Sequence, residues 1–340
     1  MSILREILGP YYLRLQRRRR RLRALRKRKE ISVVNNRASA RKDSDIFLFS
    51  TVHNERHRLA YFLDYYRKLG VNHFFFVDND SDDGTGEFLA AQPDVSLWFS
   101  SASYKRANFG MDWVNNLLRK YARDHWALVV DVDEFFVYPY YDTRPLRALT
   151  DWLDASSIKS FGALLLDMYP ENQLEDQKYI AGQSPFETLT HFDSGNYTQK
   201  LNKKYGNLWI QGGPRQRVFF ADKPALAPAL NKIPLVKWTR GNVYVSSTHT
   251  LLPRGLNKTF EDWGGEKICG CLLHTKFLPD LAHKTAREET RRQHYAGGRE
   301  YRAYKSANGN GTVLNHEHSE RFENWRQLEN LGLMSMGGWA

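Results

Sequence analysis

The chain has 340 residues, of which 41% are hydrophobic and 26% charged, as is typical of globular proteins. No apolar run approaches the roughly 18 residues that a membrane-spanning helix needs, which excludes a polytopic membrane protein. The formal net charge is +12, and residues 1–30, with twelve Lys or Arg and two Glu, carry +10 of it. The remaining 310 residues are nearly neutral, so we expect no nucleic-acid partner for the body of the protein.

The basic N-terminal segment has helical periodicity. Pro10 suits a first helical turn, and Tyr11, Leu15, Leu22 and Leu25 recur at helical spacing among arginines. A basic amphipathic helix is typical of segments that lie on an anionic membrane surface. A solvated or oligomerising arm and a nucleic-acid-binding arm are the two alternatives. Residues 1–44 are therefore predicted to form a basic tail and a polar linker.

The body begins with alternating strand and helix patterns. Apolar runs rich in strand formers alternate with segments of helical periodicity, which predicts an α/β fold with a parallel sheet covered by helices. The expected strands are 46–52, 73–77, 95–99, 127–130, 160–168, 218–220, 243–247 and 271–277, and the expected helices are 59–69, 86–91, 109–121 and 284–305. In such sheets ligands bind beyond the carboxyl ends of the strands.

An acidic motif, Asp131-Val132-Asp133-Glu134, follows the strand at 127–130. The two-residue alternation at the end of a strand points Asp131 and Asp133 the same way. Two neighbouring carboxylates repel each other unless a cation lies between them. Mg²⁺ or Mn²⁺, shared with the phosphates of a substrate, suits such ligands.

Several motifs resemble those of bacterial family 2-type glycosyltransferases of the DxDE-containing subgroup. They are Ser50-Thr51-Val52-His53-Asn54-Glu55, residues 77–85 (VDNDSDDGT), residues 131–136 (DVDEFF), residues 212–219 (GGPRQRVF), Ser247-Thr248-His249, residues 272–277 (LLHTKF) and His294-Tyr295. The resemblance implies a GT-A-like three-layer sandwich with a central, mostly parallel sheet. It covers residues 45–305, with a nucleotide-sugar-binding half at 45–140, an acceptor half at 141–305 and an extension at 306–340.

The resemblance also implies roles for particular residues. Donor-binding positions are Thr51, His53, Asn54, Glu55, Asp78, Asp80, Asp131, Arg215, Arg217 and Lys276. The metal ligands are expected to be Asp131, Asp133 and His274, with His249 as the second choice of histidine. The ion would stabilise the departing nucleoside diphosphate. An inverting transfer needs a carboxylate base, for which Asp167, Glu134 and Asp193 are the candidates.

The expected function is metal-dependent transfer of a sugar, with Mn²⁺ or Mg²⁺, from a nucleoside-diphosphate donor. UDP-sugars are the expected donors, and a lipid-linked or cell-surface polysaccharide is the expected acceptor. With the basic tail, this predicts a cytoplasmic protein held peripherally on the inner membrane. A nucleotidyltransferase is one alternative, although the segment after the first strand lacks its usual glycine-rich loop. A non-catalytic protein that binds membrane or RNA is the other.

Overall fold

A computed structural model describes residues 2–38, 42–260, 267–279 and 311–339. The helix expected at 284–305 and the His294-Tyr295 motif lie outside these residues. The helices are α1 (Ser2–Lys27), α2 (Arg56–Leu69), α3 (Thr85–Ala91), α4 (Met111–Tyr121), α5 (Leu146–Ala155) and α8 (Trp325–Asn330). The strands are β1 (Ser32–Asn35), β2 (Ile46–Val52), β3 (His73–Asp78), β4 (Val95–Phe99), β5 (Trp126–Val129), β6 (Glu134–Val137), β7 (Ser160–Asp167), β8 (His191–Asp193), β9 (Tyr197–Asn202), β10 (Asn207–Gly212), β11 (Asn231–Lys237), β12 (Val243–Ser246), β13 (Thr250–Leu252), β14 (Cys269–His274) and β15 (Ser319–Arg321).

The central sheet of the described residues has nine strands in the order β1-β4-β3-β2-β5-β11-β7-β14-β6. The pairings give β4, β3, β2, β5, β7 and β14 a common direction, and β1, β11 and β6 run against them. The predicted α/β class with a mostly parallel sheet is confirmed. The carboxyl ends of the six aligned strands share one edge of the sheet. The polar motifs that follow β2, β3 and β5 in the sequence begin at this edge.

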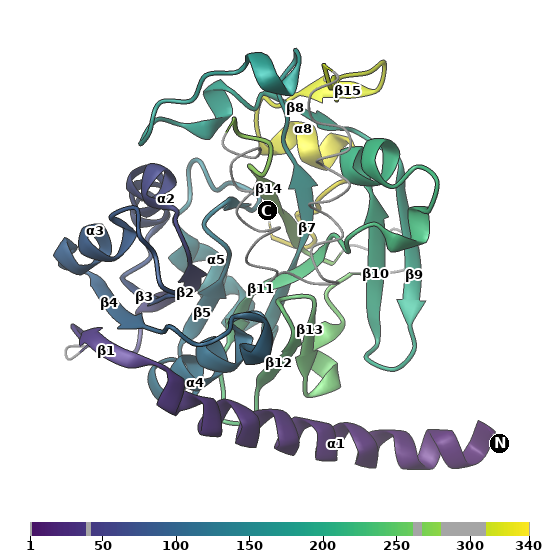
Figure 1. Ribbon diagram of the computed structural model, residues 1–340. Coiled ribbons are helices and arrows are strands. Elements are labelled where there is room, and N and C mark those ends of the chain that lie inside the picture. The colour runs from purple at the N-terminus through teal and green to yellow at the C-terminus, as the bar shows by residue number, and fades with distance from the viewer. Residues whose placement is uncertain (1, 39–41, 261–266, 280–310, 340) are drawn as a thin grey trace.

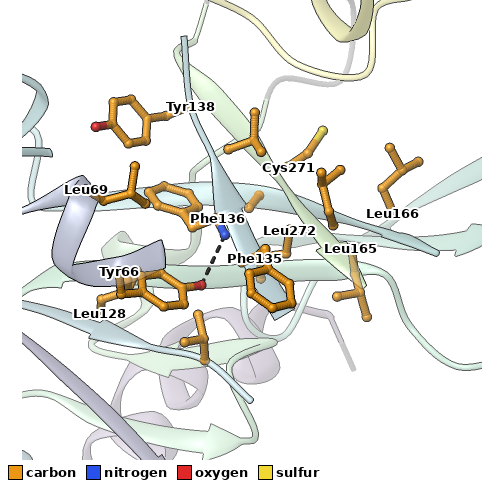
Figure 2. Close-up of a cluster of buried hydrophobic side chains, with 14 of the residues drawn as sticks. Tyr66, Leu69, Leu128, Phe135, Phe136, Tyr138, Leu165, Leu166, Cys271 and Leu272 are labelled. Atoms are coloured by element: carbon orange, nitrogen blue, oxygen red, sulfur yellow. Dashed lines mark hydrogen bonds between the residues drawn. The ribbon is translucent and has the colours of Figure 1, made fainter. Parts of the chain in front are cut away.

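Both faces of the sheet are covered, as a three-layer sandwich requires. Alternate residues of β2 enter different cores: Ile46 and Leu48 pack with α2 and α5, whereas Phe47 and Phe49 pack with α4. Figure 2 shows part of the first core, where the Tyr66 hydroxyl accepts a hydrogen bond from the main-chain nitrogen of Phe136 (3.1 Å). Burial raises the pKa of this hydroxyl well above its ordinary value, so it stays protonated. It donates in turn to the carbonyl of Glu134 (2.8 Å) and so fixes the start of β6.

The N-terminal helix α1 is docked on the body rather than projecting freely. It lies along α4 and β12, and Figure 1 shows it crossing one side of the molecule. Leu13 and Ala24 are buried on its inner face, and Leu13 packs against Val243 and Val245. The Gln16 side chain donates to the Tyr205 hydroxyl at 2.8 Å. None of the described helices, α1 included, is both long enough and apolar enough to cross a membrane.

Two local predictions differ from the structure. Residues 32–35, expected in the linker, form the edge strand β1 because the antiparallel edge of β4 satisfies their main-chain groups. The strand expected at 218–220 is wrong, since Arg215–Phe219 form a π-helical segment. The C-terminal segment packs into the main core through Trp325, Leu328 and Trp339. The domain boundaries at residues 44 and 305 stay a prediction.

Candidate active site

One edge of the sheet gathers acidic and basic side chains from four strands and from the turn between β5 and β6. The turn 130–133 leaves β5 and passes the adjacent strand ends to reach β6. At that edge His274 of β14 lies in register with both Asp167 of β7 and Glu134 of β6. Because β11 runs against β5, its first residues, including Lys232, lie at the same edge. The chain thus brings Asp131, Asp133, Asp167 and His274 together, as the strand-end argument predicts.

A chain of polar contacts runs through the imidazole of His274. Its Nε2 lies 3.3 Å from Asp133 Oδ2, and its Nδ1 lies 2.6 Å from Asp167 Oδ1. The Nε of Arg215 donates to Asp167 Oδ2 at 2.7 Å. The side chains of His274, Asp167 and Arg215 are 6%, 1% and 4% exposed, so this chain is closed to water except near Asp133, which is 20% exposed. Its geometry is therefore set by the fold.

The charges of this chain hold one another in place. Burial opposes the charge of Asp167, but Arg215 and His274 outweigh it and lower the pKa of the carboxyl below its ordinary value. Burial also disfavours a charged ring at His274, yet Asp133 and Asp167 raise its pKa. Asp167 is consequently an anion that accepts from Nδ1 and leaves Nε2 directed at Asp133.

A second buried pair lies beside the acidic motif. Lys232 Nζ is 2.8 Å from Glu134 Oε1 and 3.9 Å from Asp131 Oδ2, and its side chain is 5% exposed. Burial disfavours the ammonium charge, but Glu134 and Asp131 outweigh it and raise the pKa of Lys232. Glu134 also accepts a hydrogen bond from the main-chain nitrogen of Asp131 (3.2 Å). The pKa of Asp131 is raised to about 7, first by the removal of water around the carboxylate and second by the charge of Glu134. The outer part of the side chain still reaches solvent, since 56% of its surface is exposed.

Residues 131–133 form a turn, so the strand alternation assumed for the motif is absent. Asp131 faces Lys232, and Asp133 faces His274. The turn is held by Thr275, whose main-chain nitrogen and hydroxyl both donate to the carbonyl of Asp133 at 2.7 and 3.1 Å. Both contacts set the direction in which the Asp133 side chain leaves the turn.

The first predicted donor loop is tied to this turn through Arg58. The Nη1 of Arg58 donates to the carbonyl of Thr275 (2.7 Å), and its Nε lies 3.2 Å from the Glu55 carboxylate. Arg58 is 3% exposed, although it stands in the first turn of α2, next to the loop. Glu55 thereby helps to position the acidic turn from the neighbouring strand end.

The loops after β2 and β3 bond to each other. Asn54 exchanges hydrogen bonds with Asp82, and its main-chain nitrogen donates to the Ser81 hydroxyl. The His53 Nδ1 lies 2.9 Å from the carbonyl of Asn79. Asp78 is 5% exposed and accepts from the nitrogen and hydroxyl of Ser81; burial raises its pKa. Asp80, in contrast, is exposed at the tip of the loop with φ 65°, so its side chain is open to a ligand.

Asp193 and Arg217 belong to a neighbouring cluster. Both nitrogens of the Arg217 fork donate to the Asp193 carboxylate, at 3.0 and 3.2 Å. The same carboxylate accepts from the Tyr169 hydroxyl (2.6 Å) and lies 3.3 Å from His316 Nε2. Arg217 also donates to the carbonyl of Leu314, so this cluster fastens the C-terminal segment.

Each of the three candidate bases is buried and forms an ion pair with a basic side chain. The side chains of Asp167, Glu134 and Asp193 are 1%, 2% and 1% exposed. A base must reach the proton that it removes. This geometry does not favour proton abstraction by any of the three, and it fits them instead as groups that position Arg215, Lys232 and Arg217.

A cleft opens beside Asp131, between the ends of β2 and β5 and the start of α4. Its volume is about 50 Å³, and it is lined by Ser50, Thr51, Tyr104, Phe109, Met111, Val114, Val129, Val130, Asp131, Glu134, Ser247 and Thr248. Gly110, with φ +74°, caps α4 at its wall. A Cβ there would lie 2.8 Å from the Thr51 hydroxyl, so glycine lets the start of α4 approach β2 this closely.

Among the described residues, no three His, Cys, Asp or Glu side chains form a ready-made metal site. Two ligands are nevertheless paired, since Asp133 and His274 lie 3.3 Å apart. Neighbouring ligands at about 2.1 Å from an octahedral ion are about 3 Å apart, and Mg²⁺-type sites often take only one or two side chains plus substrate phosphates. Metal-bound histidines usually donate their other nitrogen to a carboxylate, as His274 does to Asp167. The spacing of Asp133 and His274 thus fits a divalent ion.

The remaining predicted residues lie around this centre. His249 contacts the carbonyl of Asn231 through Nδ1 (2.6 Å), and removal from water lowers its pKa to about 3, so its ring is neutral. Lys276 is half-buried two residues beyond His274. Sequence reasoning missed Arg58, Thr275 and Lys232. A lysine within the apolar run 229–236 was the available signal for Lys232, because a strand that buries it must supply a partner.

Neither the family models nor the curated proteins compared with the sequence give a match. Part of the chain is similar to two solved structures. One is the mannosyltransferase PcManGT from Pyrobaculum calidifontis in complex with GDP-Man and Mn2+, with 18% identity, a TM-score of 0.28, and coverage of 47% of this chain and 45% of that one. The other is 4-diphosphocytidyl-2C-methyl-D-erythritol synthase, with 18% identity, a TM-score of 0.26, and coverage of 42% and 67%. The chain thus spans less than half the length of the mannosyltransferase.

Proposed function

We propose that the protein is a metal-dependent glycosyltransferase that takes a sugar from a nucleoside-diphosphate donor, with UDP-sugars as the expected donors. The observation that carries the proposal is the chain Asp133–His274–Asp167–Arg215 at the carboxyl edge of the sheet. A carboxylate and an oriented imidazole at this place suit an ion that bridges to a diphosphate. In this proposal the small cleft beside Asp131 takes up part of the donor.

In this proposal Asp133 and His274 hold Mn²⁺ or Mg²⁺, and Asp131 faces the donor from the mouth of the cleft. When bound, the ion supplies positive charge to the departing diphosphate. Asp167 keeps the Nε2 lone pair of His274 directed at the ion position, and Arg215 keeps Asp167 ionised. Lys232 balances Glu134 and Asp131, which limits the negative charge that the diphosphate meets.

The acceptor in this proposal is a lipid-linked or cell-surface glycan, and the protein works at the inner face of a bacterial membrane. The outer face of α1 supports this, because Arg18, Arg19, Arg26, Tyr11 and Leu22 are exposed on it. Cations near an anionic bilayer contribute about 1 kcal/mol each, and the two apolar side chains suit the headgroup region. Inversion at the sugar carbon stays a prediction, since the three candidate bases are buried.

Donor turnover tests the chemistry. Wild-type protein with Mn²⁺ should release free nucleoside diphosphate from a UDP-sugar, slowly by hydrolysis and faster with acceptor. Asp133→Asn should lower the rate at least about 100-fold, because it removes one of two metal ligands. Asp64→Asn, which removes a carboxylate whose side chain is 55% exposed on α2, is the matched control and should leave the rate unchanged. An Asp133→Asn rate equal to the wild type contradicts the proposed site.

The same assay separates the glycosyltransferase from a nucleotidyltransferase. A nucleotidyltransferase acts on a nucleoside triphosphate and a sugar phosphate, and it releases pyrophosphate. Release of pyrophosphate from UTP or CTP, without turnover of any nucleotide sugar, would replace the proposed reaction.

Vesicle flotation tests the membrane proposal. Vesicles of phosphatidylcholine with phosphatidylglycerol should bind the wild type, and vesicles of phosphatidylcholine alone should bind it weakly. Reversing three charges of α1 (Arg18→Glu, Arg19→Glu and Arg26→Glu) should abolish binding. Three reversals elsewhere, at the exposed Lys178, Lys223 and Lys258, form the control with equal net charge. Equal binding by both variants would exclude α1 as the contact surface. Binding of the wild type to RNA rather than to vesicles, lost when the α1 charges are reversed, would favour a nucleic-acid arm.

A further inference from the structure

Arginine side chains that make no bond gather where α1 lies beside α4 (Figure 1). Arg17 and Arg21 stand one turn apart on the same face of α1, and both are half-buried. Within the described part of the chain, neither side chain forms a hydrogen bond or an ion pair, and the Nε of each is buried. The Nη nitrogens at the end of each side chain are accessible. Four Nη nitrogens on this side of α1 are thus available to a ligand.

A third arginine approaches the pair from α4. Arg119 is exposed on that helix and also makes no bond to a described residue. Burial, and then the neighbouring charges of Arg17 and Arg119, lower the pKa of Arg21 below its ordinary value. The three guanidinium groups therefore lie near one another, and we call Arg17, Arg21 and Arg119 the arginine cluster.

Two uncharged parts of the chain border the arginine cluster. Asn116 lies between Asp112 and Arg119 on one face of α4, is 7% exposed, and its amide bonds to no described residue. The turn between β11 and β12 closes another side, since a Cβ on Gly241 would lie 4.0 Å from Arg17 Nη1. The cluster is therefore bounded by three separate elements of the fold.

The charge of the arginine cluster is not balanced by the carboxylates nearby. Asp112 is paired with Arg23 at 2.6 Å, and Glu30 is paired with Lys27. Neighbouring guanidinium groups repel one another, and a buried Nε without a partner costs folding free energy. Solvated arginines would extend away from each other, but the buried Nε atoms show that Arg17 and Arg21 are packed among neighbouring side chains. A bound anion would remove both costs.

The donors of the arginine cluster indicate which anion fits. Guanidinium groups carry only donors, and their planar forks bind the oxygens of a phosphate in pairs. A phosphate group has three or four acceptor oxygens, enough for several forks and for the amide of Asn116. A single carboxylate has only two oxygens, so it cannot reach three separate guanidinium groups as well.

We propose that Arg17, Arg21 and Arg119 form a binding site for a phosphate group between α1 and α4, with Asn116 as a neutral donor beside it. The phosphate belongs to a lipid headgroup or to a small free anion, and the same donors serve either. The bound group would join α1 to α4 a second time, as the Arg23–Asp112 ion pair already does. None of these residues belongs to the proposed active site, so the inference does not depend on sugar transfer.

Calorimetric titration with EDTA present tests the site, because the chelator removes divalent ions that would give phosphate a second place to bind. Inorganic phosphate and pyrophosphate represent a free anion, and dihexanoyl phosphatidic acid below its micelle concentration represents a lipid headgroup. Joint replacement Arg17→Gln and Arg21→Gln should weaken binding of the tightest ligand at least about tenfold, because it removes two charged forks. Arg119→Gln, on the other helix, should weaken it as well.

The order of affinities identifies the source of the phosphate. Tighter binding of phosphatidic acid than of both inorganic anions assigns the site to a lipid headgroup, and the reverse order assigns it to a free anion. Either order supports the site when the arginine variants lose the binding. The bound ligand should also raise the melting temperature of the wild type but not that of the doubly substituted protein.

Joint replacement Arg18→Gln and Arg19→Gln is the matched control, because it removes two charges from the exposed face of the same helix. It should keep the wild-type affinity within about twofold, since exposed charges are screened by solvent. All these variants keep the Arg23–Asp112 ion pair that docks α1. An equal loss of affinity in the control would show general charge attraction and overturn the site. Failure of the wild type to bind any of the three ligands would also overturn it, while the proposed function would stand.

Discussion

Arg23 of the basic helix and Asp112 of α4 form an ion pair with a separation of 2.6 Å. The Asp112 side chain is 2% exposed, and that of Arg23 is 45% exposed. The arginine therefore covers the carboxylate and separates it from solvent. Arg23 also donates to the carbonyl of Arg106 (2.6 Å), just before the cleft residue Phe109. The helix that we propose to contact the membrane is thereby fastened to the wall of the donor cleft.

Arg23→Ala should destabilise the fold by about 1–3 kcal/mol, because it leaves Asp112 buried without its cation. Urea unfolding measures this difference, and hydrogen exchange should report faster opening of α1. Arg19→Ala, which removes an exposed arginine of the same helix, should change stability by less than about 0.5 kcal/mol. Equal stability of the two variants would mean that α1 is not held through Arg23.

Asp167→Asn should weaken Mn²⁺ binding in the presence of a nucleoside diphosphate about 10- to 100-fold, because the neutral amide orients His274 less strongly. Titration followed by the Mn²⁺ electron paramagnetic resonance signal gives the affinity directly. Asp193→Asn makes the same change in the neighbouring buried cluster and serves as the control. It should lower stability and leave Mn²⁺ affinity intact; a similar loss in both variants would indicate a general structural effect.

Lys232→Met should lower the free energy of unfolding by about 3–5 kcal/mol, because Glu134 would remain buried without its cation. Adding Glu134→Gln removes that isolated charge and should recover part of the loss. A double-mutant cycle, measured by urea unfolding, gives the coupling free energy between Lys232 and Glu134. Strictly additive effects would show that the 2.8 Å contact contributes little.

Acid should weaken the link between α2 and β4. Burial opposes the charge of Asp94, but the two-point contact with Arg67, at 2.6 and 2.7 Å, outweighs it and lowers the pKa of the carboxyl. Because the folded pKa lies below the unfolded value of about 3.9, the pair stabilises the fold above that pH and loses its effect as the pH falls through the folded pKa.

Asp94→Asn should therefore be about 1 kcal/mol less stable than the wild type at pH 7, with the difference shrinking as the pH falls through the folded pKa of Asp94. Urea unfolding at several pH values measures it. Asp64→Asn, which breaks an exposed pair with Lys68, should show little difference at either pH. A constant deficit of Asp94→Asn across the range would contradict the assigned role of the charge.

Local patterns were enough to predict the first half of the sheet. The strands at 46–52 and 95–99 match β2 and β4, and 127–130 extends one residue beyond β5. Their alternating or continuous apolar residues follow directly from burial on one or two faces. The π-helical segment at 215–219 escaped prediction, because the position of Arg215 is set by Asp167, 48 residues earlier in the chain.

The sequence by itself determined the α/β class and placed acidic residues directly after apolar strands, because periodicity and strand ends are local properties of the chain. It also showed that nearly all the net charge lies in the first thirty residues. Only the tertiary structure decided that Asp167 supports His274 across 107 residues, that Lys232 faces the acidic turn, and that the basic helix is docked. Those outcomes depend on which strand ends become neighbours, and that is fixed by long-range register and packing rather than by local sequence.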